Sequence, residues 1–209
     1  MNNNMCMKQL FVIAALMLLP LAVAAQDNTW EQPEKTATAT NPDAKYLAGA
    51  VPEVDGRVAF TTTIKAPGKS AKQIYDLLKA DFERITKESN QFEQSRVTVT
   101  DSVKMQVVGS YQEWLVFKNK PLNLDRTRFF YTLIADCRDG EATIQLTRIH
   151  YLYDEERLAL TYKAEEWITD KWGLNKKQTK LARVSGKFRR KTIDRKDYLF
   201  NRFTKLLEK

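Results

Sequence analysis

Two spacings of apolar residues predict the first elements of a folded domain. Residues 58–64 alternate between apolar and polar side chains, which predicts a strand with one buried face. From residue 74 to residue 85, apolar side chains recur at helical spacing. Ser70 and Gln73 precede this run with the residue types and spacing of a capping box. The pattern therefore predicts a strand, a loop and a helix over about residues 71–88.

The spacing becomes strand-like again from residue 96. Residues 97–107 contain two short alternating runs, and Gly109-Ser110 then gives a turn signal. A short strand is expected at residues 114–117, and a break follows it at residues 118–121. The pattern predicts several short strands joined by turns over this stretch.

Two longer strands are predicted over residues 128–138 and 141–153. Asp139-Gly140 between them is a strong signal for a tight hairpin. In the second strand the apolar positions change from one face to the other, so we expect a bulge near Thr147. These two strands should pair in antiparallel fashion.

Helices are expected to complete the domain. Residues 164–172 read as a short helix that ends at Gly173, and Asp194 has the chemistry to cap a last helix with an apolar stripe over residues 199–206. The order is strand, helix, four or five strands, then helices. This order predicts an α+β fold, with an antiparallel sheet of four to six strands and helices packed on one face.

The N-terminus has the three parts of a secretory signal peptide. A basic region at Lys8 precedes an apolar run over residues 10–19, and small residues end at Ala25. We expect cleavage after Ala25 or one residue earlier, and export to the periplasm or the cell exterior. An uncleaved N-terminal anchor is the alternative, although the apolar run is shorter than the roughly 20 residues that span a bilayer.

The rest of the chain divides into a tether and one domain. Residues 26–50 are polar and predict a flexible tether, and residues 51–209 predict a single α+β domain with a basic C-terminal helical region. No later segment is apolar enough to span a membrane. Cys137 would be the one cysteine left after cleavage, so no internal disulfide is expected and the thiol should be buried.

Charge is segregated along the chain. Residues 176–209 contain thirteen Lys and Arg against three acids, whereas residues 26–175 carry a net charge of −3. The candidate residues for binding an anionic partner are Lys187, Arg189, Arg190 and Lys191. Predicted export disfavours nucleic acid and favours anionic lipid, glycan or an acidic protein surface. The alternative is a solvated positive face without a partner.

No catalytic motif is complete. Gly68-Lys69-Ser70 stands where a phosphate-binding loop would, but Thr63 replaces the earlier glycine that the motif needs. His150 is the only histidine, and a strand histidine without a catalytic role is favoured over a pair with Cys137. We predict a protein that is not an enzyme and has no metal or cofactor.

Two carboxylate clusters remain as weaker candidates. Asp154-Glu155-Glu156 and Glu165-Glu166 are adjacent in sequence, whereas a glycosidase holds two carboxylates on opposite sides of a bond. We interpret both clusters as solvated side chains.

Four segments resemble a known family of exported bacterial proteins. They are residues 51–58, 66–70, 164–168 and 187–194, and the resemblance covers about residues 51–209. The family is domain-of-unknown-function family 4468, which has a TBP-like fold. The resemblance implies a β-α-β-β-β-β-α core, and it implies no activity because none is established for the family. A TBP-like fold does not by itself indicate DNA binding.

The leading hypothesis is an exported, non-enzymatic binding or interaction module. Its curved sheet would present one face to a partner, and the basic C-terminal region would strengthen contact with an anionic envelope component. The alternative is a carrier of a small apolar ligand in a pocket between sheet and helix, as in helix-grip folds. An enzyme would require His150, Cys137 or two carboxylates to converge in a cleft.

Overall fold

The computed structural model describes residues 41–121 and 123–209. The predicted signal peptide, residues 1–25, and residues 26–40 of the predicted tether lie outside the described residues. Within the described residues, no helix is both long enough and apolar enough to cross a bilayer.

The centre of the fold is a seven-stranded antiparallel sheet in the order β1-β2-β6-β5-β4-β3, with β7 also paired to β6. The strands are β1 (Glu53–Val54), β2 (Arg57–Lys65), β3 (Arg96–Asp101), β4 (Gln106–Lys120), β5 (Asn123–Arg138), β6 (Glu141–Tyr153) and β7 (Leu160–Lys163). The predicted α+β class is confirmed. The strand number exceeds the predicted range because the sheet includes the very short strands β1 and β7.

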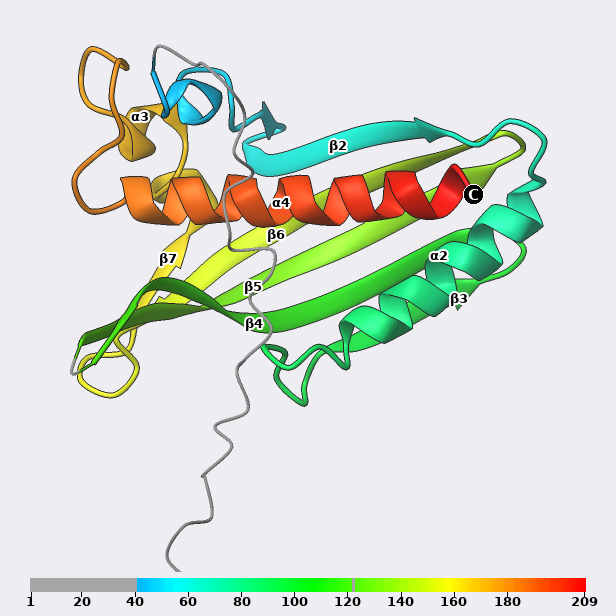
Figure 1. Cartoon of the computed structure of the whole chain (residues 1–209), viewed down its shortest axis with the longest axis horizontal. Helices are drawn as coiled ribbons and strands as arrows, with labels where there is room; N and C mark the ends of the chain where they lie inside the picture. The colour runs from blue at the N-terminus through cyan, green and yellow to red at the C-terminus, as the bar shows by residue number, and fades with distance from the viewer. Residues whose placement is uncertain (1–40, 122) are drawn as a thin grey trace, which may run out of the picture.

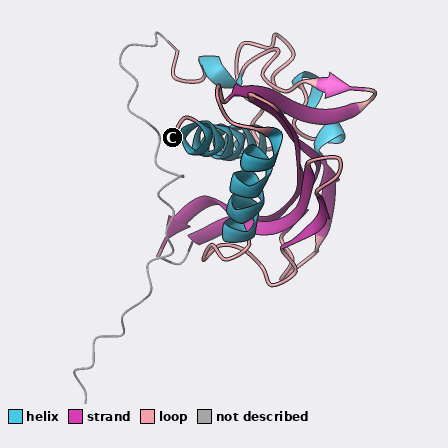
Figure 2. Cartoon of the chain, turned by 90° about the vertical axis from the view of Figure 1, so that its right-hand side faces the viewer, coloured by secondary structure: helices cyan, strands magenta, loops and turns pink. Residues whose placement is uncertain are grey.

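Two helices lie on one face of this sheet, as predicted. They are α2 (Ala71–Ile85) and the longer α4 (Gly186–Leu207), and the sheet curves around both of them (Figures 1 and 2). The helices therefore occupy the concave side of the sheet, and its convex side is the open one. Three single-turn elements complete the fold, namely η3 (Ala44–Tyr46), η4 (Ala164–Glu166) and α3 (Asp170–Gly173).

Helix α2 begins at the predicted capping box. The Ser70 hydroxyl accepts the backbone N–H of Gln73 at 3.3 Å, and the Gln73 side chain accepts the backbone N–H of Ser70 at 2.8 Å. These bonds satisfy two donors that a helix start leaves free. The helix ends at Ile85, three residues before the predicted end.

The predicted hairpin and bulge are both confirmed. Arg138 pairs with Glu141 across Asp139-Gly140, and Gly140 has a φ of 76°. The register of β5 against β6 shifts between Phe130 and Thr132, next to Thr147. The shift lets β6 keep apolar side chains toward the helices on both sides of the bulge.

The predicted turn at Gly109-Ser110 is wrong, because both residues lie inside the continuous strand β4. A Cβ atom at Gly109 would collide with the phenol ring of Tyr111. The glycine is therefore needed for a close side-chain approach within a strand rather than for a turn.

The C-terminal helices differ from the prediction. Helix α4 begins at Gly186, so Asp194 lies in its middle, where it accepts the Tyr46 hydroxyl at 2.7 Å and caps nothing. The helix extends toward its N-terminus because Phe188 adds a fully buried side chain to the apolar stripe. The helix predicted at residues 164–172 is divided into η4 and α3.

The predicted tether is also too long at its C-terminal end. Residues 41–50 belong to the folded domain, since η3 contacts α4 and the Tyr46 side chain is only 5% exposed. The Arg189 guanidinium on α4 donates to the backbone carbonyls of Tyr46 and Leu47. Tertiary contacts with a distant helix, rather than local apolar content, order this segment.

Aromatic side chains fill the space between the sheet and its helices. Tyr111, Phe129 and Tyr151 from three adjacent strands are fully buried, and Phe82 of α2 packs 5.5 Å from Phe203 of α4. The pockets that the structure describes lie elsewhere, one at the rim of the sheet and one on the outward side of α2. The apolar-carrier alternative would need a pocket between sheet and helix, where these buried aromatic side chains lie.

Candidate functional site

The four predicted anion-binding residues lie in the first turns of α4, where their environments differ. Arg189 is fully buried. Its guanidinium donates to the Ile168 carbonyl at 2.7 Å and pairs with Asp170 at 2.7 Å, besides the two carbonyls of the η3 segment. Burial lowers the pKa of Arg189 despite the nearby Asp170 carboxylate. Arg189 therefore holds three segments together and is not available to an external anion.

Lys187 is half-buried in the first turn of α4. Its Nζ donates to Asp125 at 2.7 Å and to the Tyr153 hydroxyl at 3.0 Å, and it lies 4.6 Å from the centre of the Phe117 ring. Burial alone would lower the pKa of Lys187, but the hydrogen bonds to Asp125 and Tyr153 raise it above its usual value. The charge of Lys187 is used within the fold.

Arg190 and Lys191 are the more accessible pair. Arg190 contacts Asp43 at 2.6 Å and lies over the Tyr46 ring, with its side chain 40% exposed. Lys191, the next residue of the helix, is half-buried. The structure therefore does not present the predicted quartet as one exposed cationic patch.

A deeper charged cluster on α4 escaped the sequence reasoning. Arg195 and Glu113 of β4 are both fully buried and form two hydrogen bonds of 2.7 Å. Glu88 contacts both Arg195 and Arg202, and Arg202 also pairs with Asp81 of α2. Burial raises the pKa of Glu113 to about 7, against the opposing effect of Arg195. No local pattern marks these residues, because their partners are 82 to 121 positions away in sequence.

Exposed positive charge gathers instead between α3 and α4. We call residues 171–184, which include the last three residues of α3, the basic loop. It contains no acidic residue, and its five cationic residues are exposed and form no ion pair within the described part of the chain. They are Lys171, Lys176, Lys177, Lys180 and Arg183. Four of these cations belong to the basic C-terminal region, and the acid-free run that contains them is the sequence signal for this surface.

The basic loop has a defined conformation. Its two arms are joined by a bridge between Leu174 and Leu181, and the Asn175 side chain accepts the backbone N–H groups of Thr179 and Lys180. The Ser185 hydroxyl donates to the Trp172 carbonyl, which closes the base of the loop. Figure 1 shows this loop projecting beyond α3 at the edge of the molecule.

Apolar side chains lie beside these cations. Trp172 is 47% exposed and Val184 is 56% exposed, and the closure through Ser185 brings their two arms together. Lys171 lies 4.8 Å from the centre of the Trp172 ring. The basic loop therefore combines exposed positive charge with an exposed indole.

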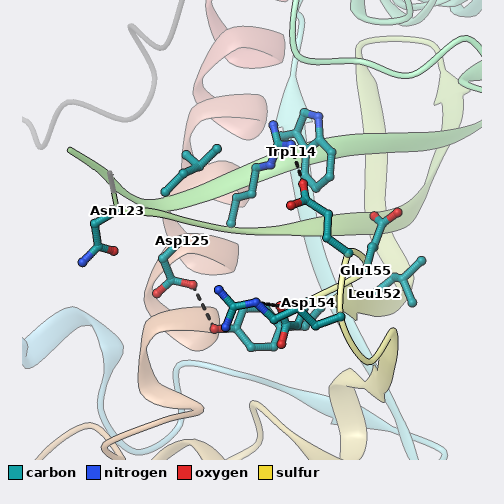
Figure 3. A pocket seen from close by; sticks show the side chains of 11 residues that line it. Trp114, Asn123, Asp125, Leu152, Asp154 and Glu155 are labelled. Atoms are coloured by element: carbon teal, nitrogen blue, oxygen red, sulfur yellow. Dashed lines mark hydrogen bonds and ion pairs between the residues drawn. The ribbon is translucent and has the colours of Figure 1, made fainter. Parts of the chain in front are cut away.

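A separate pocket of about 330 Å³ opens where the β4–β5 hairpin meets the loop after β6. Trp114, Asp125 and Glu155 are among its lining residues, and Figure 3 shows their side chains around it. The Asp125 carboxylate that holds Lys187 is part of this lining. One predicted site residue thus lies directly behind the pocket wall.

The catalytic candidates are dispersed. His150 stacks on Phe130 at 4.3 Å, and burial lowers its pKa. Cys137 is buried and pairs with Ala142, eight residues along β6 from His150, and burial raises the pKa of its thiol to about 12. The structure does not bring these two residues together.

The two carboxylate clusters also have structural partners. Glu155 accepts two hydrogen bonds from Arg128, at 2.9 and 2.7 Å. Glu165 accepts the backbone N–H of Val58 at 2.8 Å. Among the described residues, no group of three or more His, Cys, Asp and Glu side chains is arranged to hold a metal ion.

Comparison with known proteins gives a family match. Residues 60–152 match the family described as a domain of unknown function (DUF4468) with TBP-like fold. A crystal structure of a DUF4468 family protein from Bacteroides ovatus is 41% identical, with a TM-score of 0.75, and the similarity covers 80% of this chain and 95% of that chain.

A second solved structure is similar in fold. It is a TBP-like protein from Parabacteroides distasonis, with 22% identity and a TM-score of 0.62 over 75% of this chain and 96% of that chain. No curated protein matches the chain.

Proposed function

Because the chain belongs to the DUF4468 family, whose description names no activity, we propose its function from its surface. The protein is an exported, non-enzymatic interaction module that adsorbs to an anionic lipid surface through the basic loop. The observation that carries this proposal is the exposure of five cations and Trp172 on one acid-free loop.

Three basic residues of α4 differ from the loop cations, and this difference supports the loop as the contact surface. On α4, Lys187, Arg189 and Arg195 each pair with an acid from the body of the domain. A cation whose nitrogen already lies 2.7 Å from a carboxylate oxygen gains little binding energy from a second anion. The loop cations have no such competitor within the described residues, so their field extends into solvent.

The expected strength is that of reversible, peripheral binding. Each Lys or Arg close to an anionic bilayer contributes about 1 kcal/mol, so five cations would contribute about 5 kcal/mol, or roughly a few thousandfold in partitioning. Trp172 adds a ring of the type that prefers the boundary between headgroups and acyl chains. The contribution falls with salt because these charges are exposed.

Lipid is favoured over a soluble polyanion because of the apolar neighbours of the cations. A glycan or an acidic protein surface would be attracted by the charges alone. Trp172 and Val184 expose apolar surface beside the charges, and a bilayer interface accepts both at once.

Vesicle flotation tests the proposal. We expect the protein to float with vesicles of phosphatidylcholine and phosphatidylglycerol at low salt, and to stay unbound with phosphatidylcholine alone. Lys176→Ala/Lys177→Ala/Lys180→Ala should weaken binding roughly a hundredfold. The matched control removes three exposed cations elsewhere, as Lys87→Ala/Arg96→Ala/Lys104→Ala, and should retain most of the binding.

Trp172→Ala separates lipid from other anions. We expect it to weaken vesicle binding while leaving retention on a heparin column unchanged. Failure of the unmodified protein to float at low salt would overturn the proposal. An equal loss in the matched control would also overturn it, because net charge rather than the basic loop would then be responsible.

A further inference from the structure

The pocket at the β4–β5 end of the sheet has an unusually polar lining. Its volume of about 330 Å³ is at the lower end of the range of roughly 300–1,000 Å³ that is typical of ligand sites. Seven of its eleven lining residues carry a charged or amide side chain. Ligand pockets are ordinarily lined mainly by apolar groups, so this composition selects for a hydrophilic ligand.

The charges of the pocket are balanced. Each of its four carboxylates has a cationic partner, and the pairs are Asp125 with Lys187, Asp154 with Arg157, Glu155 with Arg128 and Glu156 with Arg126. An anionic ligand would be opposed by the four carboxylates. A cationic ligand would compete with Arg126 and Arg157 in the lining, and with Arg128 and Lys187, which already pair with Glu155 and Asp125. The balance favours a ligand without net charge.

Two of these pairs are tight and two are loose. Lys187 and Arg128 donate at 2.7 Å, which fixes Asp125 and Glu155 in place. Arg126 is 3.6 Å from Glu156, a separation at which neither side chain has used its hydrogen-bonding capacity on the other. The pair of Arg157 with Asp154 is equally loose, at 3.8 Å.

The loose groups are held in position by other means. The Arg126 guanidinium lies 3.8 Å from the centre of the Trp114 ring. The loop after β6 is closed by three backbone N–H groups, from residues 157–159, which all donate to the Asp154 carbonyl. Asp154 and Ala159 both adopt positive φ values, of 53° and 49°. These contacts hold the hydrogen-bond donors and acceptors around the pocket in a defined arrangement (Figure 3).

We propose that this pocket binds a neutral saccharide. Sugar hydroxyls both donate and accept, so adjacent hydroxyls match side chains that present two polar atoms side by side. Side chains of this kind lie on two walls of the pocket, namely those of Asn123, Arg126 and Glu156. Leu124 and Leu152 supply the apolar surface against which the C–H face of a sugar packs.

Saturation-transfer NMR on the full-length protein tests the proposal. The probes are maltotriose, cellotriose, mannotriose and chitotriose, each measured separately, and we expect at least one to bind with a dissociation constant of about 1 mM or below. Asn123→Ala/Glu156→Ala should weaken that binding by about tenfold or more. The Glu156 side chain is 86% exposed, so its removal should leave folding unchanged.

Two controls locate the binding. Glu83→Ala removes an exposed carboxylate from α2 and should leave saccharide binding unchanged. The basic-loop variant Lys176→Ala/Lys177→Ala/Lys180→Ala should also bind normally, because this site is independent of membrane adsorption.

Three results would overturn the proposal. They are the absence of binding for all four trisaccharides, equal binding by the pocket variant, and tighter binding of trigalacturonic acid than of any neutral probe. The last result would assign the pocket to an acidic glycan.

Discussion

Helix α4 and the basic loop are neighbours in sequence and both are rich in Lys and Arg, but they use their charges in opposite ways. On α4, Arg189 and Arg195 are fully buried and each is bonded to a carboxylate of the domain body. On the loop, Lys176, Lys177 and Lys180 are exposed and have no ion-pair partner among the described residues. The cations of α4 stabilise the fold through buried ion pairs, whereas those of the basic loop are exposed to solvent.

The number of charged residues in a segment therefore does not show whether those charges are neutralised within the fold. The body of the chain is acidic and the C-terminal region is basic, and much of this asymmetry is complementary within the same molecule. Acids on α2, on β4 and at Asp43 face the cations of α4. Part of the positive charge counted in the sequence is therefore neutralised within the molecule, whereas the basic loop keeps its charges exposed.

The largest expected effect is on the buried pair of α4. Arg195→Met leaves the Glu113 carboxylate buried without its cation, and we expect a loss of about 3–5 kcal/mol in the free energy of unfolding. Urea denaturation followed by circular dichroism measures it. The double variant Arg195→Met/Glu113→Leu should regain most of the loss. A single-variant loss below about 1 kcal/mol would mean that the pair is not important for cohesion.

Arg189→Met should have the second largest effect. It removes the donor to three backbone carbonyls and the partner of Asp170, and we expect a loss of about 2–3 kcal/mol. Limited proteolysis should also show faster cleavage within residues 41–50. Arg190→Met is the matched control, because its ion pair is partly exposed and should be worth less than about 1 kcal/mol. Equal losses in both variants would contradict the distinction between them.

The pH dependence of stability should report on Glu113. Burial raises the pKa of its carboxyl from the usual 4.5 to about 7 in the folded protein, so the ion pair with Arg195 is fully charged only above that pH. The folded state therefore binds more protons between these values, and stability falls as the pH rises through this window. Urea denaturation at several pH values should show a steeper fall for the unmodified protein than for Glu113→Gln. A fall of the same slope in both would contradict the assignment.

The smallest effect is expected from the basic loop. Lys176→Ala/Lys177→Ala/Lys180→Ala removes exposed side chains without partners, so the free energy of unfolding should change by less than about 0.5 kcal/mol. Thermal unfolding of the variant beside the unmodified protein measures the change. A loss comparable to that of Arg189→Met would show that the loop cations serve the fold, and the contrast with α4 would disappear.

Features that depend on near neighbours were predictable. The capping box at Ser70 and Gln73, the hairpin at Asp139-Gly140 and the bulge near Thr147 all follow from a few adjacent residues, and the structure confirms each of them. The α+β class followed from the order of the elements. Gly109-Ser110 misled the same reasoning, because a glycine needed for a side-chain approach has the same local signature as one needed for a turn.

The candidate site was predicted less well than the fold. Of the four named residues, Arg189 is buried and Lys187 is bound to Asp125, a residue on a strand 62 positions away. The pocket beside Lys187 was not predicted, because it is assembled from three segments of the chain. Whether a cation is neutralised or exposed depends on which acids the fold brings next to it, and local pattern contains no such information.

The alternation of strands, the amphipathic face of α2, the family and the total charge could all be read from the sequence, because they depend on composition and short-range spacing. Three features became apparent from the fold alone: which cations are solvated, where Asp194 lies in its helix, and that residues 41–50 join the domain. These outcomes rest on contacts between distant segments. The cost of burying a charge is offset only when the fold supplies its partner at hydrogen-bonding distance.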